Sequence, residues 1–179
     1  MLKRCLLLVL AAPLSAQTFE VGLNVSREAY TSQNTTPRVE AEDKTVVAAR
    51  VGYALVDLGP ALLQVTAAYQ PKVDTDLKPN GILVPTKVGH EYWGVGAMFN
   101  FKALVAVGAG VDYRFEKTTV ASVYSSSHTY GRPWARVNVG YAFPTPVVKP
   151  FIGVEAAIPL TEETLGPKGQ VGVYGGIRF

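Results

Sequence analysis

The residues whose types come nearest to nucleophilic catalysis are four consecutive ones, Ser125, Ser126, Ser127 and His128. A serine nucleophile must be held by a base, and a third group must orient that base. His128 is followed by Thr129 and Tyr130 in a polar stretch typical of a loop, which does not hold three side chains in one geometry. We therefore expect no catalytic residue here and no enzyme activity.

Metal chemistry has few candidate ligands. The sequence contains two histidines, His90 and His128, and a single cysteine, Cys5, close to the N-terminus. A metal site needs several such side chains at suitable spacing. We expect no metal site and no cofactor-binding residues.

Eight charged residues alternate with apolar ones, and their expected chemistry is ion pairing. They are Glu20, Arg50, Asp112, Arg114, Glu116, Arg136, Glu155 and Arg178. Successive side chains of a strand point to opposite faces, so these charges share the face opposite the apolar one. If the apolar face meets lipid, the charges must face inward, because an arginine facing lipid costs up to about 2–4 kcal/mol near the midplane of the membrane.

We expect these charges to form ion pairs that fill the interior of a closed barrel, since buried charges need partners. Glu20, near the start of the first strand, and Arg178, near the end of the last, would pair across the closing seam. A second network would consist of Asp112, Arg114, Arg136 and Glu155. The alternative for the same charges is a small pore that is gated when they exchange partners.

The elements that position these charges are eight segments of alternating apolar and polar residues. The predicted strands cover 18–29, 44–55, 61–70, 90–101, 105–116, 132–143, 149–160 and 169–179. Short connections at 56–60, 102–103 and 144–148 alternate with long ones at 30–43, 71–89, 117–131 and 161–168. Outer-membrane barrels have an even number of strands and this asymmetry of loops. The sequence predicts an all-β fold, an eight-stranded antiparallel up-and-down transmembrane β-barrel.

A soluble antiparallel barrel or sandwich would also alternate. Glycines, however, recur on the charged face, as at Gly94, Gly96, Gly108 and Gly110. A narrow interior needs such small neighbours beside bulky charged side chains, whereas a water-facing surface has little use for them. The glycines therefore favour the membrane barrel, which must close because every backbone polar group in lipid needs a partner.

Aromatic residues gather at the two ends of the predicted strands. At the short-connection end they are Phe19, Tyr53, Phe99, Phe101, Tyr141, Phe143 and Phe179, and at the other end Tyr69, Trp93, Tyr113 and Phe115. Membrane barrels carry aromatic girdles at both interfaces. We expect these residues to form the two girdles, and we expect His90, at a strand start, to lie at an interface.

The N-terminus has the pattern of a secretory signal peptide over residues 1–16. Lys3 and Arg4 precede an apolar run that is about half the ~20 residues of a membrane-spanning helix. Removing them leaves 15 basic against 14 acidic residues, a formal charge of +1. No basic block with interleaved aromatics is present, so we expect no nucleic-acid partner. Residues 17–179 would form a single barrel domain.

With these features, the sequence resembles the small outer-membrane β-barrels of the OmpA and OmpX type from about Thr18 to Phe179. The resemblance includes the C-terminal Tyr174, Ile177 and Phe179, which look like the signal ending in Phe that the barrel-assembly machinery recognises. It implies a Gram-negative cell envelope and a location in the outer membrane.

The resemblance implies a monomeric integral outer-membrane protein with a structural or surface-interaction role through its extracellular loops. A narrow porin-like channel is the alternative. A lipid A-modifying enzyme is less favoured, because His128 lacks the His-x-Ser arrangement of barrel deacylases. Outer-membrane lipid and lipopolysaccharide are expected partners, beside a surface partner of the loops. The basic residues expected to reach lipopolysaccharide phosphates are Lys72, Lys78, Lys87, Lys117, Arg132 and Lys168.

Overall fold

The structure, a computed structural model, describes residues 19–30, 39–79, 86–102, 105–121, 124–145, 147–163 and 166–179. The predicted signal peptide, 1–16, lies outside the described residues, as does part of the predicted turn at 102–103. Within the described residues, no helix has the length and apolar content needed to cross a bilayer.

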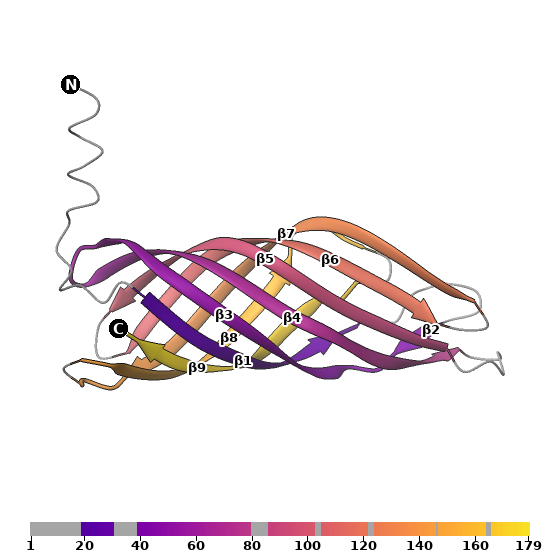
Figure 1. Ribbon diagram of the computed structural model, residues 1–179, viewed down its shortest axis with the longest axis horizontal. Coiled ribbons are helices and arrows are strands. Elements are labelled where there is room, and N and C mark those ends of the chain that lie inside the picture. The colour runs from indigo at the N-terminus through magenta and orange to yellow at the C-terminus, as the bar shows by residue number, and fades with distance from the viewer. Residues whose placement is uncertain are drawn as a thin grey trace, which may run out of the picture.

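The described residues form nine strands. They are β1 (Phe19–Ala29), β2 (Val39–Ala41), β3 (Lys44–Asp57), β4 (Ala61–Pro79), β5 (Thr86–Lys102), β6 (Ala106–Ala121), β7 (Ser125–Ala142), β8 (Lys149–Pro159) and β9 (Gly169–Arg178). The strands cross the molecule obliquely, and the C-terminus lies at the end opposite β2 (Figure 1).

Eight of the strands close into a barrel in which neighbours along the chain are neighbours in space. Each pair from β3 to β9 is antiparallel, and β1 pairs with both β3 and β9, which closes the sheet. At the seam, Glu20 lies opposite Gly52 of β3 and Arg178 of β9. The predicted fold class, an eight-stranded antiparallel up-and-down barrel, is confirmed.

Several strands are longer than the sequence predicts. β4 continues to Pro79 and β7 begins at Ser125, in segments that we expected to be loops. The short β2 pairs with the far end of β4 and was not predicted. The expectation of long loops at 71–89 and 117–131 is therefore wrong over most of their length. Ladder hydrogen bonds continue there although the apolar alternation has ended.

The barrel is apolar outside and polar inside. Along β3 the side chains alternate between buried and exposed from Lys44 to Tyr53, and the exposed ones include Val47 and Val51. Buried residues are mostly polar or charged, whereas the outward positions carry large apolar side chains. This inverts the pattern of a soluble domain, in which charged residues are seldom fully buried. The outer surface suits hydrocarbon, as expected of a transmembrane barrel.

Glycines make room for the interior side chains. A Cβ at Gly96 would collide with the Asp112 carboxylate of the neighbouring strand, and one at Gly140 would lie 2.6 Å from the Tyr174 hydroxyl. In the β3–β4 turn, Gly59 has a φ of +80°, and its N–H donates to the Asp57 carboxylate. The glycine-rich inward face therefore fits a narrow lumen filled by larger neighbours.

The outward face of β7 provides a test of this orientation. Val137 is outward and 56% exposed, and Thr129 is exposed on the same strand but nearer its N-terminal end, beyond the girdle residues. We expect Val137→Arg to lower the unfolding free energy in lipid vesicles by about 2–4 kcal/mol, because the charge would face hydrocarbon. Thr129→Arg should change it by less than about 0.5 kcal/mol. Urea titrations in lipid vesicles measure these free energies. An equal loss of unfolding free energy in the two variants would contradict the outward orientation of Val137.

Candidate functional site: the polar interior and the projecting sheet

An ion pair links β1 and β9 across the seam, beside their backbone ladder. Arg178 Nη2 lies 2.6 Å from Glu20 Oε2, and Arg178 Nε donates to the same oxygen at 3.3 Å. The Arg178 guanidinium also lies over the Phe151 ring, 5.6 Å from its centroid. The structure therefore places Glu20 and Arg178 together at the level where the sequence predicts them.

A second cluster occupies the middle of the lumen. Arg50 Nη1 lies 2.6 Å from Glu155 Oε2, and Arg136 Nη2 lies 3.1 Å from Asp112 Oδ1. Arg136 Nε is also 3.8 Å from Glu155, and Arg114 Nη2 is 3.7 Å from Asp112. All five side chains are buried. The four residues that we grouped by sequence lie in one network, which Arg50 joins from β3.

A third cluster centres on Glu116 and His90, both inaccessible to solvent. His90 Nδ1 lies 3.1 Å from Glu28 Oε1, and His90 Nε2 lies 3.0 Å from Glu116 Oε2. Each ring nitrogen faces a carboxylate that can only accept when ionised, so we assign His90 as an imidazolium that donates twice. The other Glu116 partners are Arg132, which donates to both carboxylate oxygens at 2.8 Å, and Trp134, whose Nε1 donates at 2.6 Å.

Two residues of this third cluster correct the sequence analysis. His90 was expected at an interface and Arg132 beside the outer loops, and both expectations are wrong because the side chains are buried inside the barrel. Their strands start earlier than predicted, so the inward face reaches them. The signal that would have found them is the even-numbered parity along the extended strands. Arg132 shares it with Arg136 on β7, and His90 shares it with the inward Gly94 and Gly96 on β5.

The rim of the third cluster is completed by Tyr30 and Lys44. Tyr30 Oη, just past the end of β1, donates to Glu28 Oε2 at 2.9 Å. Burial raises the pKa of the Tyr30 phenol, and the nearby Glu28 charge raises it further, so the hydroxyl keeps its proton. Lys44 Nζ lies 3.9 Å from Glu28 and donates to the Val73 carbonyl oxygen. The Glu28 carboxylate is therefore surrounded by the Tyr30 hydroxyl, the His90 ring and the Lys44 ammonium group.

The aromatic residues that we expected in girdles all point outward. Those at the end with the short connections are 40–52% exposed, and Tyr69, Trp93, Tyr113 and Phe115 are 36–55% exposed. Trp93 and Phe115 stack with centroids 4.1 Å apart, and Phe19 and Tyr53 meet edge to face at 6.0 Å. Of the C-terminal residues, Ile177 and Phe179 face outward and Tyr174 faces the lumen.

The segment that carries the serines and His128 lies on a strand. Ser127 and His128 are successive residues of β7, so their side chains point to opposite faces. The His128 ring stacks on Tyr130, 5.5 Å between centroids. Among the described residues, no three His, Cys, Asp or Glu side chains have the arrangement of a metal site. The geometry here is that of an exposed strand.

We use the name projecting sheet for the parts of β4–β7 that extend past the outward rings of Tyr69, Trp93 and Phe115. The β6–β7 ladder continues to Ala121 opposite Ser125. β8, in contrast, pairs with β7 only from Trp134 onward. Residues 125–132 therefore have β6 on one side and, among the described residues, no strand on the other. We call these residues the β7 edge.

The basic residues expected to contact phosphates differ in their surroundings. Lys72 lies 3.2 Å from Asp74, and Lys117 lies 3.1 Å from Glu91, on the outside of the barrel. Arg132 is committed to Glu116 and to the Pro167 carbonyl oxygen inside it. At Lys72 and Lys117 the exterior of the projecting sheet thus presents paired charges of both signs.

The fold and the inverted polarity define an eight-stranded transmembrane β-barrel of the outer-membrane type. No family model and no curated protein matches the sequence. The solved structures similar to it include Ail, the attachment invasion locus protein of Yersinia pestis (11% identity, 90% of this chain and 97% of that chain, TM-score 0.56), Neisserial surface protein A (13%, 89% and 95%, 0.52) and OprG of Pseudomonas aeruginosa (11%, 89% and 92%, 0.53). At this identity the similarity concerns the fold.

The third cluster provides a stability test. We expect Glu116→Gln to lower the unfolding free energy by about 3–5 kcal/mol, because His90 and Arg132 would remain buried without their shared anion. The matched control is Glu91→Gln, which removes the surface partner of Lys117 and should cost no more than about 1 kcal/mol. Urea unfolding in vesicles measures both. Equal effects of the two substitutions would contradict the dependence of the lumen on Glu116.

Proposed function

We propose that this chain is an integral protein of the Gram-negative outer membrane whose closed barrel holds the projecting sheet at the cell surface to bind an extended polypeptide segment. Export would use residues 1–16 as the signal peptide. The barrel-assembly machinery would recognise the C-terminal Tyr174, Ile177 and Phe179. Outer-membrane lipid and lipopolysaccharide would surround the monomeric barrel.

The single observation that carries the proposed function is the β7 edge. An edge strand presents a row of unpaired N–H and C=O groups that another chain can extend. The first five residues of the edge, Ser125 to Thr129, are all exposed and polar. Strand addition of this kind draws affinity from main-chain hydrogen bonds. An extended segment of a surface partner therefore fits this edge.

The charge pattern favours a polypeptide over a polyanion. The Ail protein of Yersinia pestis has been solved in complex with the heparin analogue sucrose octasulfate. A sulfated ligand of that kind requires a cluster of free cations. Of the six basic residues predicted to meet phosphates, Lys72 and Lys117 have acidic neighbours, Lys87 lies opposite Asp76 in the β4–β5 ladder, and Arg132 is buried. The backbone edge does not depend on such charges.

Strand addition predicts which part of the chain binding needs. Removing residues 119–127 shortens the β6–β7 hairpin and deletes part of the β7 edge, whereas removing 77–85 shortens the β4–β5 hairpin and leaves that edge in place. Peptides selected on the full chain in lipid nanodiscs should bind the second variant as they bind the wild type and bind the first at least about tenfold more weakly.

Backbone methylation of the selected peptides gives an independent readout. N-methyl groups at alternate residues should weaken binding, while those at the residues between should not, because only every second N–H faces the partner strand in an antiparallel pair. Binding that survives removal of 119–127, or that is insensitive to N-methylation, would exclude the β7 edge as the binding site.

The filled lumen generates a prediction about conduction. The three ion-pair clusters and Trp134, which is inaccessible to solvent, occupy the interior, so we expect no stable single-channel conductance in a planar bilayer. A porin reconstituted in the same bilayer would verify the recording conditions, and gel mobility with and without boiling would verify folding. Stable conductance steps from the folded protein would favour the narrow channel.

A further inference from the structure

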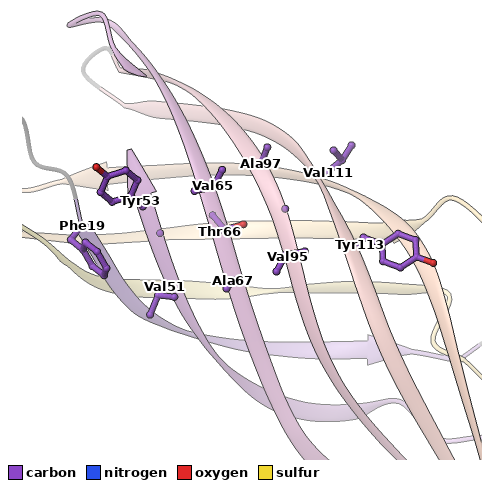
Figure 2. Close-up of a pocket in the computed structure, with 12 residues that line it drawn as sticks. Phe19, Val51, Tyr53, Val65, Thr66, Ala67, Val95, Ala97, Val111 and Tyr113 are labelled. Carbon is purple, nitrogen blue, oxygen red and sulfur yellow. The ribbon is translucent and has the colours of Figure 1, made fainter. Parts of the chain in front are cut away.

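The outer wall of the barrel is hollowed over β3–β6. The groove has a volume of about 650 Å³. Figure 2 shows the small side chains of Ala67 and Ala97 in its middle, with Val65 and Val95 beside them. The two alanines lie on neighbouring strands, where Val65 pairs with Ala97 and Ala67 with Val95, so small and branched residues alternate across the groove.

Aromatic rings line the groove at its two ends. In Figure 2, Phe19 and Tyr53 lie on one side and Tyr113 on the other. Phe19 packs on the Tyr53 ring at 6.0 Å. Tyr113 meets the Phe115 ring at 5.1 Å, and its hydroxyl lies close to Gly131 of β7, on the side away from β5. Phe19 also stacks on Phe179, outside the groove, at 6.2 Å, and in Figure 2 neither it nor the two tyrosine rings lie over the alanines.

The polar groups nearby are turned away from the groove. Thr66 is the threonine of the lining. Its Oγ1 accepts a hydrogen bond from Arg136 Nη2 inside the barrel at 3.0 Å. The hydroxyl of Tyr113 lies at the boundary of the groove beside Gly131. In Figure 2 the Tyr53 oxygen points away from the alanines, and the rest of the lining is apolar or glycine, so the middle of the groove presents hydrocarbon groups to whatever fills it.

We propose that the groove binds one acyl chain of a membrane lipid. It lies between the two sets of outward aromatic rings, where the outward surface is apolar, so hydrocarbon is what reaches it. Transfer from bulk lipid to the groove brings no hydrophobic gain, and the chain is held by dispersion contacts with the groove walls. The binding is therefore a preferred residence of one chain at this wall.

A second copy of this chain fits the groove less well. A two-fold dimer places the same patch on both subunits, so hollow would face hollow across the interface. The voids left there would forfeit the contacts that drive association in a membrane. A flexible acyl chain, in contrast, adapts to a shallow groove.

Photolabelling can locate the bound chain. The folded protein would be reconstituted with a phosphatidylcholine that carries a diazirine on one acyl chain, and the labelled peptides would be identified by mass spectrometry. We expect several-fold more adducts on the groove lining than on the outward residues of β8 and β9. Ala97→Phe, which fills the groove, should abolish this excess.

The matched control is Ala156→Phe, which enlarges an outward alanine on β8, away from the groove. It should leave the excess unchanged, and heat-modifiable gel mobility would verify that both variants fold. Labelling spread evenly around the barrel, or an excess that persists in Ala97→Phe, would overturn the proposal. Concentration-dependent crosslinks between copies through the groove residues would also overturn it, because a second copy would then be the occupant.

Discussion

Backbone hydrogen bonding in lipid is the constraint on which this structure depends. Every N–H and C=O at membrane depth needs a partner within the protein, and a sheet meets that requirement only when its first and last strands pair. Here β1 pairs with β9 over ten residues, from Glu20 opposite Arg178 to Ala29 opposite Gly169. Closure turns one face of every strand toward a narrow lumen that side chains fill, so the inward residues must both pack closely and pair their charges.

In the lumen, both requirements are met by clusters in which one carboxylate accepts hydrogen bonds from several donors. Glu116 accepts from His90, Arg132 and Trp134, and Glu155 accepts from Arg50 and Asn24. A buried charge is tolerable when its lone pairs and protons are satisfied, and removal of one member leaves the others exposed to the full desolvation cost. The interior is therefore specified by a few acidic residues. The glycines opposite them provide the space that the larger side chains occupy.

The sequence predicts this fold well where one face meets lipid, and poorly beyond it. Within the membrane, apolar residues such as Val21 and Val137 mark the outward positions, so the strands, the closure and the eight inward charges follow from parity. Past Tyr69 and Phe115 polar residues occur on both faces of the sheet, with apolar ones such as Val88 among them, and the alternation that identifies a strand disappears. Residues 125–131 therefore look like a loop in the sequence, although ladder pairing with β6 continues, and His90 and Arg132 were placed outside for the same reason.

The two tryptophans of the chain occupy opposite environments, which has a spectroscopic consequence. Trp93 is 53% exposed on the outward face and stacks on Phe115, whereas Trp134 is inaccessible to solvent, with the Arg114 and Arg132 guanidinium groups 4.1 and 4.8 Å from its ring centre. Lipid-borne quenchers can reach the Trp93 indole, while the Trp134 emission depends on the cations beside it. Single-tryptophan variants would therefore separate two events of folding in real time: the arrival of the wall in hydrocarbon and the closing of the lumen.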